Sequence, residues 1–279
     1  MNFPASRRIG ARASVAAVLL ILSELSVGCA ARKRAQDKAR ILDPDTLYRM
    51  AVEDIEQDRT LSAKQYLERI QYTPQSRTQL EPLVRVALAD VAFLVGDDIS
   101  LIDARAKYLD FVTLYGDHPR APYAQVQAGV CSLKRAAAPS KDQTQTLVAI
   151  TDLKEVMRRY PSSPYVRAAE DRLRAAEDRL AEHDFNVGTF YFKRRSYMAA
   201  SERFRGLLNQ YPRFNGKEKV YYYLGESLVR ANNGTEGRLY LEKLIADYPS
   251  GYFAEDARRS LATLTGGDSP DSRPPKKKG

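Results

Sequence analysis

The side chains that could carry catalysis or bind a metal are few and scattered in this sequence. Its two histidines, His118 and His183, lie far apart, and neither belongs to a metal-binding spacing such as His-Glu-x-x-His. The carboxylates mostly fall beside arginines at helical spacing, so no pair is set apart for general acid–base catalysis. No glycine-rich loop of the kind that holds phosphate occurs either. We therefore expect a protein that is not an enzyme and that needs no cofactor or metal.

One of the two cysteines stands where a lipid could be attached. Arginines near the start are followed by an apolar run over residues 13–22, which is too short to span a bilayer as a helix. Gly28 then precedes Cys29, which resembles the lipobox of bacterial lipoproteins, although Ser26 occupies the place where leucine is usual. This predicts a signal peptide over residues 1–28 and a lipid on Cys29 that holds the protein at the periplasmic face of the outer membrane. An uncleaved anchor and an ordinary cleaved signal are the alternatives.

Charge is concentrated at the two ends of the chain, whose formal net charge is +9. We expect residues 29–43 to form a basic tether and residues 266–279, rich in Gly, Pro, Ser and Lys, to form a disordered tail. An exported protein does not meet nucleic acid, so anionic lipid headgroups are better candidates for these charges. The second cysteine, Cys131, lies in an apolar helical stretch and is expected to be a small buried side chain without a disulfide.

A pattern of small, apolar and proline residues recurs along the rest of the chain. Gly188, Ala200, Phe204 and Pro212 occupy positions 8, 20, 24 and 32 of a 34-residue window, which is the tetratricopeptide pattern of two antiparallel helices. Small residues at positions 8 and 20 let the two helices cross closely, and proline ends the second helix. Four further windows share this spacing. Five units are predicted within residues 44–265, beginning near Pro44, Arg85, Pro122, Ala181 and Glu218.

One irregularity separates units three and four. The heptad RAAEDRL occurs twice, from Arg167 and from Arg174, and no glycine or proline interrupts residues 165–187. This predicts one long helix from about Pro164 to about Arg195, roughly 45 Å at 1.5 Å per residue. The heptads allow a coiled-coil dimer, but we expect a monomer within a hetero-complex because alanine fills many seam positions. The predicted fold is all-α, a right-handed α-solenoid of five tetratricopeptide-like helix pairs with one long bridging helix between units three and four.

The stretch from Tyr160 to Pro212 carries a resemblance to a known family. It contains RYPSSPY and DRLAEHDFNVGTFYFKRRSYMAASERF, and in these runs it resembles the BamD family of lipoproteins, also called YfiO or ComL. The resemblance extends more generically over residues 45–264, while the insertion in unit three and the lysine-rich tail depart from it. It implies a non-catalytic periplasmic adaptor of the β-barrel assembly machinery. It also implies that the C-terminal units bind POTRA domains of BamA and the N-terminal units bind unfolded outer-membrane protein segments.

The side chains expected to face the concave groove of such an array differ between its two halves. In units four and five they include charged residues such as Lys219 and Glu226. In units one to three they are largely apolar or aromatic, which suits an extended client segment. Packing of these side chains against neighbouring units is the alternative. The client groove is predicted at Tyr48, Val52, Ile55, Phe93, Tyr123 and Val126.

The resemblance also implies a docking site on the second helix of unit four. In the family a basic residue on this helix meets a POTRA carboxylate, and Arg203 is the position that aligns with it. Phe204 should be buried at position 24, so Arg203 should point outward; an ordinary solvated arginine is the alternative. The predicted docking set is Arg203, Arg205, Lys193, Arg194 and Arg195.

Two other functions remain open at this point. The chain could be another periplasmic tetratricopeptide lipoprotein that scaffolds cell-envelope or division machinery, similar to the CpoB proteins. Those proteins carry an N-terminal coiled coil before the repeats, whereas this chain has only a short tether there. It could instead be a carrier of unfolded clients without a fixed complex. Identifying the proteins that purify with it from membranes separates the three.

Overall fold

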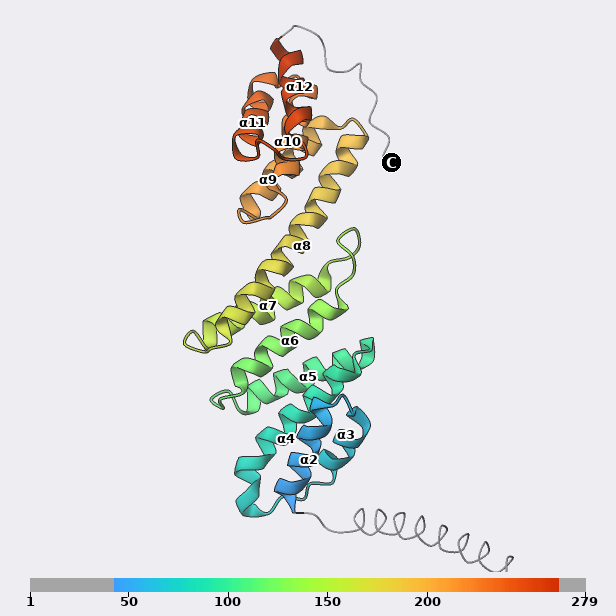
Figure 1. Cartoon of the computed structure of the whole chain (residues 1–279), viewed down its shortest axis with the longest axis vertical. Coiled ribbons are helices and arrows are strands. Elements are labelled where there is room, and N and C mark those ends of the chain that lie inside the picture. Colours follow the sequence, from blue (N-terminus) through green and yellow to red (C-terminus); the bar gives the residue numbers. More distant parts are fainter. Residues whose placement is uncertain (1–42, 266–279) are drawn as a thin grey trace, which may run out of the picture.

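The computed structural model describes residues 43–265, and every regular element in that range is a helix (Figure 1). The helices follow one another as packed pairs along an elongated molecule, which confirms the predicted solenoid of five pairs. Units one to three consist of α2 (Pro44–Glu56) with α3 (Thr60–Glu68), α4 (Pro74–Val95) with α5 (Asp98–Leu114), and α6 (Ala121–Arg135) with α7 (Thr144–Arg159). Units four and five consist of α8 (Val166–Lys193) with α9 (Tyr197–Gln210), and α10 (Lys217–Arg230) with α11 (Gly234–Asp247), followed by α12 (Ala254–Thr265).

Small residues lie where the two helices of a unit cross. In unit three, a Cβ added to Gly129 would come within 2.8 Å of Leu153 Cγ, and in unit five a Cβ on Gly225 would come within 2.7 Å of Leu241 Cγ. Real Cβ atoms do not approach other carbons so closely, so only glycine permits these crossings. The alanines at position 20 are fully buried in the first four units: Ala63, Ala104, Ala149 and Ala200.

The long bridging helix between units three and four is α8, which has 28 residues and is about 42 Å long. Its first half is part of unit three, because Ala169 packs with Leu153 and Val156 of α7. Its second half is part of unit four, because Ala181 and Phe185 share a core with residues of α9 and α10. Figure 1 shows α8 running obliquely between the two halves of the molecule.

Two element boundaries differ from the sequence pattern. The first helix of unit two begins at Pro74 and not near Arg85, because Thr73 and Ser76 form a capping box and proline is well tolerated in the first helical turn. Pro74 therefore starts a helix, where the pattern placed it at the end of the preceding one. The helix α12 was not anticipated. It covers the end of unit five, burying Ala254 and Ala257 against Leu241 and Leu244.

Several sequence predictions fall on residues outside the described range. They concern the signal peptide 1–28, lipidated Cys29, most of the tether 29–43 and the tail 266–279, and they stay predictions. Within residues 43–265, none of the helices combines the length and the apolar character that crossing a bilayer requires. Cys131 is free and fully buried, as predicted, and burial raises the pKa of its thiol to about 12.

Candidate partner-binding surfaces

The residues predicted to form the client groove do not share one environment. Tyr48 and Ile55 of α2 are half-buried and pack on the core between units one and two, and Val52 is half-buried as well. Phe93 of α4 is also half-buried, with the Lys134 ammonium 4.4 Å from its ring centroid.

Val126 of α6 does not belong to this surface. It is buried in a core with Leu153, Val156 and Ala169, because α7 of the same unit and the start of α8 close over it. In this structure Val126 cannot contact a client, so its side chain serves packing.

Tyr123 belongs to a polar network centred on Asp90 of α4. Tyr108 Oη donates to Asp90 Oδ1 at 2.6 Å, and Tyr123 Oη donates to the same oxygen at 2.8 Å. Gln127 Nε2 donates to Tyr123 Oη at 3.1 Å. Burial raises the pKa of Asp90, while the two hydroxyl donors and the positive charge of Arg120 act in the opposite direction. The network joins units two and three through side chains that face each other across the unit boundary.

Two further residues extend this region beyond the predicted set. Tyr165, just before α8, meets the Tyr123 ring edge-on at 5.7 Å between centroids. The charge of Arg120 acts on the pKa of Tyr48 as well as on that of Asp90, so these three groups lie within electrostatic range of one another. Asp90 could have been recognised from the sequence, because it is a single charged residue inside the apolar run of α4. Nothing in the sequence pattern indicated a role for Tyr165.

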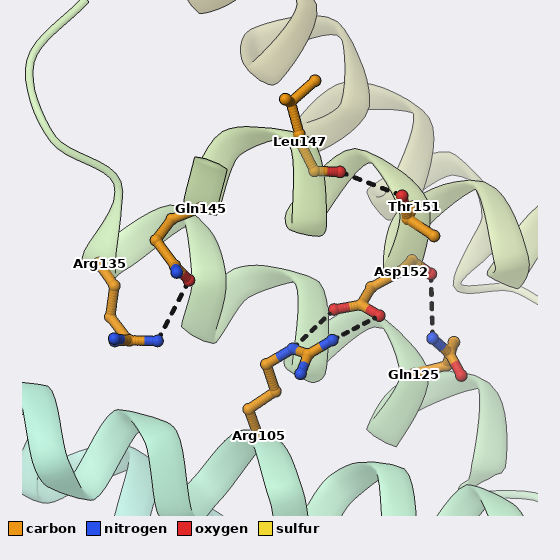
Figure 2. A network of polar contacts seen from close by, with 7 residues as sticks. All are labelled: Arg105, Gln125, Arg135, Gln145, Leu147, Thr151 and Asp152. Atoms are coloured by element: carbon orange, nitrogen blue, oxygen red, sulfur yellow. Dashed lines mark hydrogen bonds and ion pairs between the residues drawn. The ribbon is translucent and has the colours of Figure 1, made fainter. Parts of the chain in front are cut away.

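Figure 2 shows the polar contacts that hold α5, α6 and α7 together. Arg105 of α5 binds Asp152 of α7 with two parallel hydrogen bonds, Nε to Oδ2 at 2.9 Å and Nη2 to Oδ1 at 3.1 Å. Gln125 of α6 donates from Nε2 to the Asp152 carbonyl at 3.1 Å. Arg135 donates to Gln145 Oε1, also at 3.1 Å. Burial raises the pKa of Asp152, and the hydrogen bond and charge of Arg105 oppose that shift.

Of the predicted docking residues, one forms ion pairs within the described part of the chain and the other four form none. Arg205 is half-buried and donates to Glu202 Oε1 and to Glu236 Oε1, each at 2.7 Å. Because Glu236 lies on α11, Arg205 links units four and five. Its pKa is raised chiefly by the hydrogen bond to Glu236.

The other four cations are exposed, three at the turn between α8 and α9 and one on α9. Lys193, Arg194 and Arg195 end α8 and form the turn to α9, where Arg195 takes a positive φ of 60°. Arg203 is exposed on α9 with its guanidinium 6.0 Å from the Tyr191 ring centroid, and Phe204 beside it is fully buried, as predicted. Among residues 43–265, no carboxylate lies within ion-pair distance of any of these four cations.

The second half of the groove is more aromatic than its charged residues suggested. Tyr223 of α10 contacts Phe185, Phe192 and Phe253 at centroid distances of 5.5, 5.2 and 6.0 Å. A charged residue predicted for this half of the groove contacts one of these rings: the Lys219 ammonium is 4.4 Å from the Phe185 ring centroid. Phe185 and Phe192 occupy positions 5 and 12 of unit four, which face the groove in the repeat pattern, whereas Tyr223 and Phe253 lie outside the groove-facing positions.

Two charged residues of the same half are engaged internally. The Arg230 guanidinium is 5.0 Å from the Phe192 centroid, and Arg230 binds Glu226 at 2.7 Å. Glu226 is itself buried and also accepts a hydrogen bond from Ser260 of α12. This pair therefore holds α10 against its neighbours.

An open pocket of about 540 Å³ lies where α8 leaves unit three. Pro139, Arg179, Phe214 and Lys219 contribute to its lining. Its charged groups are used internally: Lys219 Nζ donates to Glu182 Oε2 at 2.5 Å, and Arg179 donates to carbonyls at the C-terminal end of α6. Within residues 43–265, Lys219, Glu182 and Arg179 of this pocket are therefore held by contacts inside the molecule.

The histidines serve local structure. His118 Nδ1 accepts a hydrogen bond from the Arg120 backbone N–H at 3.1 Å, and burial lowers the pKa of its imidazole. His183 Nδ1 lies 2.7 Å from the Pro139 carbonyl oxygen, so this nitrogen carries a proton. In the part of the chain that the structure describes, no group of three or more His, Cys, Asp or Glu side chains could hold a metal ion.

Comparisons with known proteins agree with the arrangement of units. A family model described as outer membrane lipoprotein, YfiO, matches residues 41–232, and a tetratricopeptide repeat model matches residues 219–251. The chain is similar to the outer membrane protein assembly factor BamD of Caulobacter vibrioides, with 24% identity over 151 residues, 54% of this chain and 50% of that protein. It is also similar to BamD of Rickettsia prowazekii, with 22% identity over 233 residues, 83% of this chain and 90% of that protein.

The chain thus spans about half the length of the first relative and nine-tenths of the second. Among solved structures it is similar to the TPR2AB domain complex of yeast Sti1 with pHSP90. That similarity has a TM-score of 0.41 and 13% identity, and it covers 80% of this chain and 84% of the other.

Proposed function

The chain belongs to the YfiO family of outer membrane lipoproteins, and on that premise we propose that it is a non-catalytic adaptor in the assembly of outer-membrane β-barrel proteins. The family membership confirms the resemblance expected from residues 160–212. The relatives in Caulobacter and Rickettsia are named outer membrane protein assembly factors. A solenoid of helix pairs suits an adaptor because stacked units present long surfaces without a catalytic centre.

In this proposal the basic surface of unit four docks POTRA domains of a BamA-like partner. The observation that carries it is the set of four exposed cations, Lys193, Arg194, Arg195 and Arg203, which form no ion pair within residues 43–265, although the charge of Arg203 acts on Asp184. Most of the other arginines within residues 43–265 sit in ion pairs. Unpaired surface charges of one sign steer and orient a partner of opposite charge.

The half-buried side chains of units one to three would hold unfolded client segments. Tyr48, Val52, Ile55 and Phe93 expose part of their apolar surface, and Tyr123 and Tyr165 add aromatic edges. Extended peptides are commonly held by such partly exposed aromatic and apolar side chains. The two functions would then occupy opposite ends of the solenoid, joined by α8.

The docking proposal is tested by reversing one charge. Arg203→Glu should weaken binding to a purified POTRA fragment by at least tenfold at low salt, because it adds repulsion to a lost attraction. A carboxylate-to-lysine change on the POTRA surface should restore binding. The control is Arg158→Glu on α7, which is also exposed but lies in unit three and pairs with Glu155.

Both variants should retain the wild-type thermal midpoint, since exposed substitutions seldom cost more than about 0.5 kcal/mol. Wild-type affinity in Arg203→Glu, or equal losses in the two variants, would contradict docking through unit four. Crosslinkers at Val52 should capture a synthetic barrel-strand peptide, and crosslinkers at Thr151, on α7 of unit three, should not.

A further inference from the structure

The insertion in unit three is the loop between α6 and α7, residues 136–143, and we call it the latch. The loops at the same place in the other units have two or three residues, such as 57–59 after α2 and 96–97 after α4, whereas the latch has eight. Figure 1 shows it extending past the ends of α6 and α7 toward α8. Two or three residues are enough to join antiparallel helices, so the latch is longer than the turn itself requires.

Hydrogen bonds inside the latch give it a defined shape. Gln143 is 7% exposed, and its Nε2 donates to the carbonyl oxygens of Ala138 at 2.9 Å and of Lys141 at 3.1 Å. Thr146 of α7 donates from Oγ1 to Gln143 Oε1 at 2.9 Å. The buried Gln143 amide is therefore satisfied at both its nitrogen and its oxygen, which fixes the latch to the start of α7.

Two side chains of α8 hold the latch. Arg179 donates from Nη2 to the Ala136 carbonyl at 2.9 Å and from Nε to the Ala137 carbonyl at 3.0 Å. About one turn later along α8, His183 Nδ1 lies 2.7 Å from the Pro139 carbonyl oxygen. The carbonyls bound by Arg179 directly follow α6, where the helix dipole favours a cation and the last carbonyls have no partner within the helix.

The latch meets α8 where the apolar packing of this helix passes from one half of the molecule to the other. Leu180 shares a core with Ile150 of α7, and the next residue, Ala181, shares a core with Phe204 of α9. Each core covers α8 on one side of this point only. The angle between the two halves therefore depends on the contacts that α8 makes here.

Polar contacts to units four and five come from adjacent positions of α8. Asp178 Oδ1 accepts a hydrogen bond from the Asn215 backbone N–H at 3.3 Å, and Glu182 Oε2 accepts one from Lys219 Nζ at 2.5 Å. Pro139 of the latch and Asn215 of the α9–α10 turn both line the open pocket of about 540 Å³. The two halves thus bind neighbouring residues of α8 and leave an open space beside them.

We propose that the latch fixes the angle between units one to three and units four and five. Through Arg179 and His183, unit three holds α8 about one turn beyond Leu180, the last apolar contact with α7. The latch therefore sets the distance between the surface proposed to dock a partner and the surface proposed to hold clients. This consequence rests on the proposed function, whereas the angle itself is a property of the chain alone.

Distances between two spin labels test the latch. The full-length lipoprotein in detergent carries nitroxides on cysteines that replace Ala106 of α5 and Ala246 of α11, both exposed, and pulsed electron paramagnetic resonance gives the distribution of distances between them. Cys131 is fully buried and should stay unlabelled. The wild-type chain should give one narrow distribution. Arg179→Met should widen it about twofold or shift its maximum, because methionine fills similar space but cannot bind the latch carbonyls.

The matched control is Arg172→Met. Arg172 is an exposed arginine of the same helix, but the carbonyl to which it donates, that of Ala168 at 3.2 Å, belongs to α8 itself. This variant should keep the wild-type distances. Replacing residues 136–143 by Gly-Ser-Gly gives a loop as long as that after α2 and should widen the distribution at least as much as Arg179→Met. If that replacement prevents folding, the Arg179 variant decides.

Three outcomes would overturn the proposal: wild-type distances in Arg179→Met, equal changes in Arg179→Met and Arg172→Met, or a broad distribution in the wild-type chain. Docking is tested by a different measurement. The affinity for a POTRA fragment should be unchanged in Arg179→Met, whereas Arg203→Glu should lose affinity and keep the wild-type distances. A failure of the latch and a failure of the proposed docking are therefore distinguishable.

Discussion

At the scale of single residues, one missing side chain sets the distance between α8 and α9. Gly188 lies directly against the Phe204 ring, and a Cβ added there would approach two ring carbons to 2.8 Å. Phe204 is fully buried and packed on Phe185 and Tyr223, so it has little room to move. The close crossing therefore depends on glycine at this position.

Gly188→Ala should lower the free energy of unfolding by about 1–2 kcal/mol, because overpacking outweighs the better helix propensity of alanine. The matched control is Gly206→Ala on α9, where a Cβ would meet no atom within 4 Å. That variant should be stabilised by about 0.5–1 kcal/mol through helix propensity. Urea denaturation of both variants measures the change in the free energy of unfolding. If both variants were more stable than the wild type, the Phe204 ring would have moved to make room for the added methyl group.

Asp90 should make stability depend on pH in a direction opposite to that of an ordinary salt-bridged carboxylate. Burial raises the pKa of Asp90 above its unfolded value of 3.8, so the folded protein binds this proton more tightly. Its contribution to stability is fully present below the unfolded pKa and is lost as pH rises through the folded pKa. Asp90→Asn keeps an acceptor for Tyr108 and Tyr123 without this loss.

The stability of Asp90→Asn relative to the wild type should therefore increase as pH rises from about 4 to 7. The measurement is urea denaturation of the two proteins across this pH range. If their free energies of unfolding change in parallel with pH, the charge of Arg120 and the tyrosine donors cancel the effect of burial on the pKa of Asp90.

At the scale of elements, the ion pair between Arg105 and Asp152 joins units two and three. Asp152 is buried, and its two carboxylate oxygens receive the two hydrogen bonds from Arg105. Removing one partner of a buried pair leaves an uncompensated charge. Arg105→Ala should therefore cost about 3 kcal/mol of unfolding free energy, measured by chemical denaturation at pH 7.

An exposed ion pair supplies the control for that measurement. Arg158 pairs with Glu155 on the surface of α7, and its side chain is mostly solvent-exposed. Arg158→Ala should cost less than about 0.5 kcal/mol. If the two variants lost equal stability, the charge of Asp152 would be screened by solvent and would not need Arg105 as a partner. The Arg105→Ala variant should also unfold with a steeper dependence on pH, because the unpaired Asp152 would hold its proton to higher pH.

Most of the helix pairs could be predicted because their rules are local. Glycine, alanine and proline at fixed spacing reflect the crossing and the end of helices within one unit, so the pattern found the second helices and the length of α8. The start of α4 at Pro74 was not predicted because proline both ends and begins helices, and the cap formed by Thr73 and Ser76 decides between them. α12 was missed because a single helix has no partner helix to complete the repeat pattern.

The candidate surfaces were less predictable because they depend on contacts between units. Repeat position correctly placed Phe204 inside and Arg203 outside, since both facts follow from one helix. It could not show that Val126 is enclosed by α7 and by Ala169 of α8, or that Arg205 is bound by Glu236 of α11. Neither relation is encoded in the spacing of a single unit.

At the scale of the whole molecule, α8 determines how the two halves are placed. Its first half packs on α7 and its second half on α9, so both halves of the solenoid share one continuous backbone. Arg174→Pro would remove a backbone donor from the middle of α8 and kink it, at a cost of about 3 kcal/mol. Small-angle X-ray scattering should then show a changed radius of gyration, while Arg174→Ala should leave it unchanged.

Thermal unfolding provides an independent readout of the same change. A break in α8 should separate one cooperative transition into two, because each half keeps its own core. A single transition in Arg174→Pro, together with unchanged scattering, would show that packing on α7 holds the helix straight.

The division of α8 between two cores also bears on the order in which the protein acquires its structure. The buried side chains of α8 that pack on α7 lie before Ala181, and those that pack on α9 and α10 begin at Ala181. A polypeptide delivered across the inner membrane from its N-terminus can therefore finish three units before the last two have emerged. The second half of α8 is then already helical when α9 and α10 emerge, and these helices pack on it. Export and folding therefore proceed in the same direction along the chain.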